Sequence, residues 1–167
     1  MTEKANYQIV RASGLGTDLD DFECKVLADI MRVEHLTDNA VLVGEGEDNH
    51  ALFLLAEGNL AVTSMVGEQE NAVYTMKAGE CAGTRAFIDR EPRRVTLRAV
   101  GSATVYCLEP IAFESMLCAY PRLVYHVMRS LFRITHLNLM RMNIEADQLK
   151  QYISRFGSRA FPGSPVL

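Results

Sequence analysis

Apolar residues in the first part of the chain recur with helical spacing. From Leu19 to about Met31 they fall three or four positions apart, which places them on one face of an α-helix. Thr17 or Asp18 is available to cap the N-terminus of this helix. We therefore expect an N-terminal tail over 1–16 and then a helix that packs on whatever follows it.

The pattern changes between residues 41 and 108, where short runs of apolar and β-branched residues alternate with turn residues. Runs of this kind, with no long helix between them, are typical of an antiparallel sandwich or barrel. The expected strands are Val41–Val43, Ala51–Leu55, Leu60–Met65, Ala72–Met76, Val95–Ala99 and Ala103–Leu108. The expected turns lie at Gly44–Gly46, Gly58-Asn59, Gly67-Glu68, Gly79 and Gly101-Ser102.

Helical spacing returns after the strands. Pro110 and Pro121 each suit the first turn of a helix, and no proline or glycine interrupts 122–156. The fold class is therefore α+β and mainly β, with a small barrel flanked by an N-terminal helix and a long C-terminal helix from about 121. We place one domain over 17–156 and a loose tail over 157–167.

The long helix carries more apolar surface than a small barrel can cover. A helix of about 35 residues extends about 50 Å, and its apolar positions form one stripe followed by a shifted one. These positions are Val124, Val127, Leu131 and Ile134, then Leu137, Met140 and Ile144. We expect a homodimer through this helix, and the alternative is that every apolar side chain is buried within one chain.

Composition excludes several classes of protein. The formal net charge of −4 argues against a simple basic nucleic-acid binder, although residues 1–120 carry a net −9 and 121–167 a net +5. No apolar stretch is long enough to span a membrane and Met1–Lys4 does not open a signal peptide, so we expect a cytoplasmic protein. Cys24, Cys81, Cys107 and Cys118 form no close pair, and we expect four reduced core thiols.

The connection Gly79–Arg94 is the longest within the β region, and five arginines fall between Arg85 and Arg98. Strand alternation places Thr96 and Arg98 outward, and its extension backward places Arg93 inward and Arg94 outward. An inward guanidinium needs an anion, which is either an internal carboxylate, Asp89 or Glu91, or a ligand phosphate.

A short helix over Ala86–Asp89 would aim the amides that begin at Gly83–Arg85 toward the same place. Local physics leaves the internal ion pair and the phosphate site both open.

Several segments match one family in the right order. They are Val43–Glu47, Leu52–Val62, Gly79–Gly83, the stretch Gly83–Thr96, Phe113-Glu114 and Tyr120–Leu123. Over Leu19–Asn143, about three quarters of the chain, the sequence resembles the cyclic-nucleotide-binding domain found in the catabolite activator protein and in regulatory subunits of protein kinase A. The fold that the resemblance implies is a small jelly-roll β-barrel, in which Gly83–Thr96 is the phosphate-binding cassette.

The resemblance also implies a ligand and its contacts. Arg93 matches the arginine that holds the cyclic phosphate, whereas Thr84 stands where the family has a glutamate for the ribose 2′-hydroxyl. Glu80 lies too far before Arg93 to replace it, and Arg94 occupies a position that is small in the family. The implied ligand is a cyclic nucleotide, cyclic AMP first. Its implied binding residues are Gly83, Thr84, Arg85, Ala86, Arg93 and Arg94.

The expected function is that of a ligand-sensing regulatory module resembling the sensor part of a transcriptional regulator. Because few residues follow Phe156, we expect no DNA-binding domain in this chain and no direct DNA binding. Either a protein partner reads the signal, or a DNA-binding part has been lost. The alternative, motivated by Thr84, is a degenerate domain that binds no nucleotide and serves in dimerisation or docking, with Arg93 paired to Asp89 or Glu91.

We expect no enzyme, cofactor or metal site. His35, His50, His126 and His136 form no metal-binding motif: only His50 lies at a predicted strand, and His126 and His136 are expected at the surface or an interface.

Overall fold

The computed structural model describes residues 3–156, and two units divide the chain after Phe132. The first unit holds a sheet, the shorter helices and the beginning of the long helix α6 (Pro121–Phe156). The second unit holds the remainder of α6. Within residues 3–156, no helix is long and apolar enough to cross a membrane.

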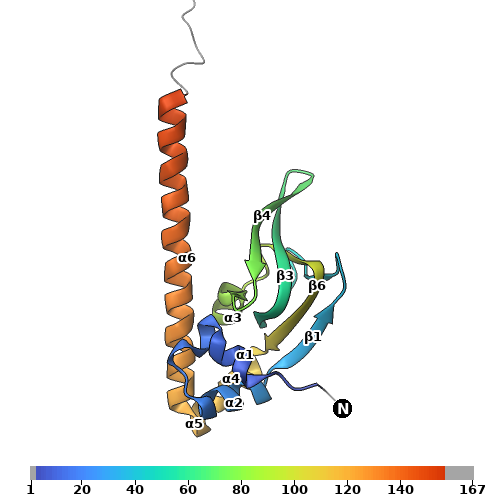
Figure 1. The fold of residues 1–167 in the computed structure, drawn as a ribbon, viewed down its shortest axis with the longest axis vertical. Helices are drawn as coiled ribbons and strands as arrows, with labels where there is room; N and C mark the ends of the chain where they lie inside the picture. The colour runs from blue at the N-terminus through green and yellow to red at the C-terminus, as the bar shows by residue number, and fades with distance from the viewer. Residues whose placement is uncertain (1–2, 157–167) are drawn as a thin grey trace, which may run out of the picture. The chain divides into compact units, whose positions relative to one another are not determined.

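The sheet confirms the predicted α+β fold class, mainly β, with a small jelly-roll barrel (Figure 1). Its antiparallel path is β1-β6-β3-β4, while β2 pairs with β6 and β5 pairs with β3. The strands are β1 (Arg32–Leu36), β2 (Val41–Val43), β3 (Leu52–Val66), β4 (Gln69–Lys77), β5 (Cys81–Ala82) and β6 (Thr96–Leu108). The predicted turn at Gly67 is confirmed, because it joins β3 to β4.

The turns predicted at Gly58-Asn59 and Gly101-Ser102 are wrong, because β3 and β6 run through both positions. The register of β3 against β6 shifts twice between Leu55 and Asn59, so the glycine marks an irregularity inside a long strand. A Cβ on Gly58 would lie 2.2 Å from the Ser102 carbonyl oxygen, and its φ is 84°. Glycine therefore lets the two strands approach closely here.

The barrel interior is apolar and is built by alternate residues of four strands. Its buried members are Val43, Ala51, Phe53, Leu55, Leu60, Met76, Leu97, Ala99, Ala103, Val105 and Cys107. The inward direction predicted for Leu97 and Ala99 is confirmed. Strands β1 and β5 were not predicted: β1 reads Arg-Val-Glu-His-Leu, without a clear alternation, and β5 has two residues.

The segment 1–16, expected to be a tail, carries α1 (Tyr7–Ala12) and the start of a 3₁₀ helix, η1 (Gly14–Asp18). Both elements are anchored by fully buried side chains, Val10 and Leu15. These helices gather with α2 (Asp21–Asp29), α4 (Pro110–Glu114) and α5 (Met116–Ala119) at one end of the sheet, opposite the tip of the β3–β4 hairpin (Figure 1).

The helix expected from Leu19 to about Met31 is α2, and its predicted caps are wrong. It begins at Asp21 and is capped by Asp20. The Asp20 carboxylate accepts the Glu23 amide at 2.8 Å, and the Glu23 carboxylate accepts the Asp20 amide at 3.1 Å. This reciprocal capping box satisfies two amides at once, which a single side chain at Thr17 or Asp18 would not do.

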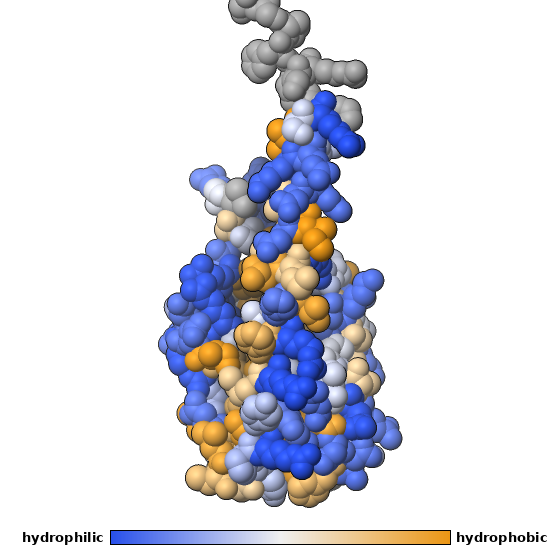
Figure 2. Space-filling model, turned by 90° about the vertical axis from the view of Figure 1, so that its left-hand side faces the viewer, coloured by the Kyte–Doolittle hydropathy of each residue, from blue (hydrophilic) through white to orange (hydrophobic). Residues whose placement is uncertain are grey.

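The predicted bounds of α6 are confirmed, and α4 begins at Pro110 as expected. Within 121–132, Leu123, Val127 and Leu131 are buried. All side chains of 135–155 are exposed, and apolar groups interrupt the polar surface along α6 (Figure 2). The tail predicted over 157–167 lies outside the described residues.

Two side chains lie elsewhere than expected. His126 is not a surface residue: its side chain is 15% exposed, and Nδ1 lies 3.1 Å from the Glu23 carboxylate. Cys118 is exposed and not in the core, while Cys24 and Cys107 are buried, Cys81 is half-buried and all four thiols are free.

Candidate functional site

A cavity of about 180 Å³ lies between the short helix α3 (Thr84–Asp89) and the beginning of β6. All six predicted binding residues line it. The complete lining is Val43, Ala82, Gly83, Thr84, Arg85, Ala86, Pro92, Arg93, Arg94, Val95 and Leu97. The structure thus brings together two segments that the sequence separates by the loop 90–92.

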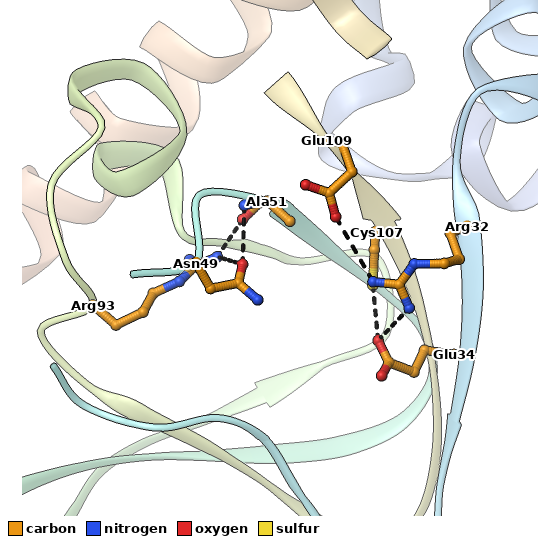
Figure 3. Close-up of polar contacts among 7 residues, drawn as sticks. All are labelled: Arg32, Glu34, Asn49, Ala51, Arg93, Cys107 and Glu109. Atoms are coloured by element: carbon orange, nitrogen blue, oxygen red, sulfur yellow. Dashed lines mark hydrogen bonds and ion pairs between the residues drawn. The ribbon is translucent and has the colours of Figure 1, made fainter. Parts of the chain in front are cut away.

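Arg93 is buried, with 5% of its surface exposed, so its predicted inward direction is confirmed. Its Nη2 donates to the Asn49 side-chain oxygen at 3.0 Å and to the Ala51 carbonyl at 2.5 Å (Figure 3). The guanidinium also lies over the Phe53 ring, 4.5 Å from its centre. These neutral contacts orient the side chain, and the carboxylates of Glu47 and Glu109 act on its charge without contacting it.

The backbone of Arg93 is fixed independently of its side chain. Its amide donates to the Glu47 carbonyl at 2.9 Å, and its carbonyl accepts the Gly46 amide at 2.8 Å. Glu47 in turn holds the Gly44 amide at 2.8 Å through its carboxylate. The turn between β2 and β3 therefore positions the last part of the cassette.

Gly83 permits the close approach of the Arg93 guanidinium. It precedes α3 with a φ of 88°, a conformation that side chains with a Cβ rarely adopt. A Cβ at this position would lie 2.1 Å from Arg93 Nη1 and 3.1 Å from the Ala51 carbonyl oxygen. Glycine is needed both for the turn into α3 and for the space that Arg93 occupies.

The predicted alternative of an ion pair between Arg93 and Asp89 or Glu91 is wrong. Within the described residues 3–156, no carboxylate lies within 4.0 Å of the Arg93 guanidinium, and Arg93 Nε has no hydrogen-bond partner there. Glu91 instead contacts Arg85 Nε at 2.8 Å and, more distantly, Arg94 Nη2 at 3.6 Å. The hydrogen bond from Arg85 lowers the pKa of Glu91, while burial lowers the pKa of Arg93.

A second arginine in the same view is bound differently (Figure 3). Arg32 on β1 lies 3.0 Å from Glu34 and 3.7 Å from Glu109, so two carboxylates face its charge. The Cys107 thiol donates to the same Glu34 carboxylate at 3.3 Å. Unlike Arg93, Arg32 therefore has carboxylates of its own chain within 4.0 Å.

The other predicted residues take distinct places around the cavity. Thr84 begins α3 and is half-buried, and Ala86 is buried two positions later. The side chains of Arg85 and Arg94 are 53% and 68% exposed, which confirms the outward direction predicted for Arg94. The first amides of α3 have no acceptor within their own helix, as in every helix N-terminus.

The sequence did not reveal Asn49, Ala51 and Phe53 as partners of Arg93. Asn49 and Ala51 lie 44 and 42 positions before Arg93, and two contacts bring these parts of the chain together: β2 pairs with the start of β6, and the Arg93 backbone bonds to Gly46 and Glu47. An asparagine just before an apolar strand is common in turns, so no local signal marks Asn49 as a hydrogen-bond acceptor for Arg93.

The chemistry of this arrangement is anion binding. A buried guanidinium with neutral partners, at the wall of a cavity, gains a counter-charge when a phosphate or carboxylate enters. Within residues 3–156, no group of three or more His, Cys, Asp or Glu side chains is placed to hold a metal ion.

Known proteins share this fold. The regulatory subunit of cAMP-dependent protein kinase from Yarrowia lipolytica is 30% identical over 101 residues, which cover 60% of this chain and 26% of that protein. The chain thus spans about a quarter of the length of the curated relatives that it matches.

Solved structures agree in fold. The regulatory domain of Toxoplasma gondii PKA with cAMP has a TM-score of 0.66 and 27% identity, over 78% of this chain and 48% of that one. The Thermus thermophilus catabolite activator protein has a TM-score of 0.72 and 20% identity, over 83% and 63% of the two chains. The model of the cyclic nucleotide-binding domain matches residues 33–120, more than half of the sequence, and the chain therefore belongs to the cyclic nucleotide-binding domain family.

Proposed function

We propose that this chain is a ligand-sensing regulatory module that binds a cyclic nucleotide, cyclic AMP in the first place. The observation that carries the proposal is Arg93, a buried guanidinium that lines a cavity and meets only neutral oxygen atoms. A cyclic phosphate would supply the missing negative charge. Gly83, Thr84, Arg85, Ala86 and Arg94 would form the rest of the site.

The signal would pass from the cassette helix to the beginning of α6. Phe87 of α3 packs against Phe113 of α4, with ring centres 5.5 Å apart. A second cavity, of about 300 Å³, separates these rings from Val124 and Met128 of α6 and leaves room for repacking. A ligand that binds better to one packing than to the other would shift the population of the two.

The output would be an interaction between proteins. Leu137, Met140 and Ile144 are exposed at near-heptad spacing, which suits a homodimer through α6. Sedimentation of the purified chain should give a dimer, and the double variant Leu137→Glu, Ile144→Glu should give a monomer. A native chain that sediments as a monomer at micromolar concentration would contradict the dimer. The dimer, or a further protein partner, would then read ligand occupancy.

The binding proposal is tested by isothermal titration calorimetry with cyclic AMP and cyclic GMP. We expect micromolar binding that Arg93→Ala abolishes and that Arg93→Lys weakens by about tenfold or more, because lysine keeps the charge but loses the planar fork. Arg32→Ala is the matched control and should leave the affinity unchanged, since Arg32 faces carboxylates outside the cavity.

Circular dichroism and thermal melting establish that each variant is folded. The absence of heat with folded native protein would overturn nucleotide sensing and favour the module that acts only in dimerisation or docking. Equal binding by the native protein and both Arg93 variants would show that the nucleotide does not bind at Arg93.

A further inference from the structure

The cavity that contains Arg93 is lined by an excess of positive charge. Of the described residues that line it, three are arginines and none is an aspartate or a glutamate. The nearest acidic partner is Glu91, which Arg85 and Arg94 share from outside the lining. Glu91 faces the two rim guanidinium groups, Arg85 and Arg94, and no carboxylate of the lining faces Arg93, so the lining keeps an excess of positive charge for a ligand.

The three arginines lie at different depths. Arg93 is 5% exposed and is held by Asn49 and Ala51, which makes it the inner cation. The side chains of Arg85 and Arg94 are more than half exposed and form the rim. Arg85 makes two contacts to Glu91, at 2.8 and 3.0 Å, whereas the single contact of Arg94 is 3.6 Å long. Arg94 is therefore the rim cation that an incoming anion would engage most easily.

The cavity is small for a whole nucleotide. A cavity of about 180 Å³ is smaller than the 300–1,000 Å³ of typical ligand pockets, so much of a nucleotide would project past the rim. Thr84 offers a neutral hydroxyl on the wall and places no negative charge there that would repel a second anion.

We infer that the cavity takes a nucleotide with two phosphate groups, one held inside by Arg93 and the second held at the rim by Arg94 and Arg85. This inference rests on the proposed function and extends its ligand class: a nucleotide with two or more negative charges binds more tightly than cyclic AMP, which carries one. Two sources share this chemistry, namely a cyclic dinucleotide and a linear nucleoside diphosphate.

The experiment is calorimetry of the full chain with cyclic AMP, cyclic di-AMP and ADP, which share a base and differ in phosphates. We expect at least one of the two-phosphate ligands to bind about tenfold more tightly than cyclic AMP, as one added charge-assisted contact would give. The advantage should shrink between about 50 and 300 mM salt, because the rim arginines are exposed to screening. Cyclic di-AMP against ADP identifies the source.

Arg94→Gln should remove most of that advantage, because it should weaken the two-phosphate ligand more than it weakens cyclic AMP, whose phosphate stays with Arg93. Arg98→Gln is the matched control, since Arg98 pairs with Glu70 away from the cavity, and it should change neither affinity. Thr84→Glu should weaken the two-phosphate ligand by adding a negative charge, whereas Thr84→Gln should not.

The outcomes separate the two proposals. Binding of cyclic AMP as tight as that of both two-phosphate ligands, with no change in Arg94→Gln, overturns this inference and leaves nucleotide sensing intact. No binding of any of the three ligands by folded protein overturns both. A two-phosphate preference that persists in Arg94→Gln and in Arg85→Gln overturns the assignment of the second phosphate to the rim.

Discussion

Arg32 and Arg93 lie in neighbouring parts of one barrel, yet their surroundings differ in a way that separates structure from function. Arg32 is half exposed and faces Glu34 and Glu109, so its charge is compensated within the fold. Arg93 is buried deeper and meets an amide oxygen, a carbonyl and an aromatic ring. An arginine that is compensated by its own chain has little left for a ligand, whereas one held only by neutral atoms retains its attraction for an anion.

The largest effect on this difference between the two arginines is expected from a variant that displaces the Arg93 guanidinium and leaves residue 93 itself unchanged. Gly83→Ala adds a Cβ 2.1 Å from Arg93 Nη1 at a φ of 88°. We expect this variant to lose about 1–3 kcal/mol of unfolding free energy through backbone strain, and to bind nucleotide far more weakly because the guanidinium must move. Urea unfolding and calorimetry measure the two effects.

Gly46→Ala is the matched control, because Gly46 has a φ of 85° and open space around its missing Cβ. It should lose about 1 kcal/mol from the backbone conformation alone and keep its affinity. Equal affinities for Gly83→Ala and Gly46→Ala would mean that the guanidinium does not need the space beside residue 83.

Smaller effects are expected when the charge of Arg93 or of Arg32 is removed and the unfolding free energies of the two variants are compared. Arg93→Met should leave the unfolding free energy unchanged or raise it by up to about 1 kcal/mol, because an uncompensated buried charge is exchanged for an apolar side chain. Arg32→Met should lower it by about 0.5–1 kcal/mol, because Glu34 and Glu109 lose their cation. Urea unfolding of both variants decides the signs. A loss of more than about 2 kcal/mol in Arg93→Met would make Arg93 a structural residue.

The smallest effect concerns the thiol beside Arg32. Burial, reinforced by Glu34, raises the pKa of Cys107 from its ordinary value near 9 to about 12. We expect one fast-reacting thiol at pH 8, the exposed Cys118, and four after unfolding in urea, measured with a chromogenic disulfide reagent. Cys118→Ser should abolish the fast phase; a fast phase that remains would contradict burial of the other three.

The raised pKa of Cys107 also determines whether the unfolding free energy rises or falls with pH. Because the Cys107 thiol has the higher pKa in the folded chain, its contribution is complete below the ordinary thiol pKa and is lost as the pH rises toward 12. Unfolding free energies measured at pH 8 and pH 10 should therefore decrease with pH.

Sequence reasoning reached the direction of Arg93 because strand alternation is a local rule. The period of two was extended backward from Val95 to Arg93, and the inward direction of Arg93 agrees with it although β6 itself begins at Thr96. The bounds of α6 were equally accessible, since helical periodicity continued from Pro121 without a proline or glycine. In both cases the deciding information lies within a few residues.

The partners of Arg93 were beyond that reach, because the pairing of β2 with β6 and the backbone bonds of Arg93 to Gly46 and Glu47 bring Asn49 and Ala51 to it. The same limit explains why an ion pair with Asp89 or Glu91 stayed open beside the phosphate site. Both carboxylates are close to Arg93 in sequence, but Glu91 pairs with Arg85 of α3. Gly58 was misread as a turn because a glycine that lets two strands meet has the same local signature as a glycine that reverses the chain.

The passage of β3 through Gly58 has a consequence for how quickly the chain folds. The β3–β4 hairpin closes over a two-residue turn at Gly67, an event on the order of microseconds. In contrast, β6 joins β3 through pairs such as Leu52 with Leu108 and Thr63 with Thr96, which require the whole cassette to be spanned first. Such distant pairings close slowly, in the millisecond-to-second range of barrel-like domains. The anion-binding cavity is also completed late, because Arg93 reaches Asn49 and Ala51 only when the distant strands β2 and β6 pair, Val43 with Leu97.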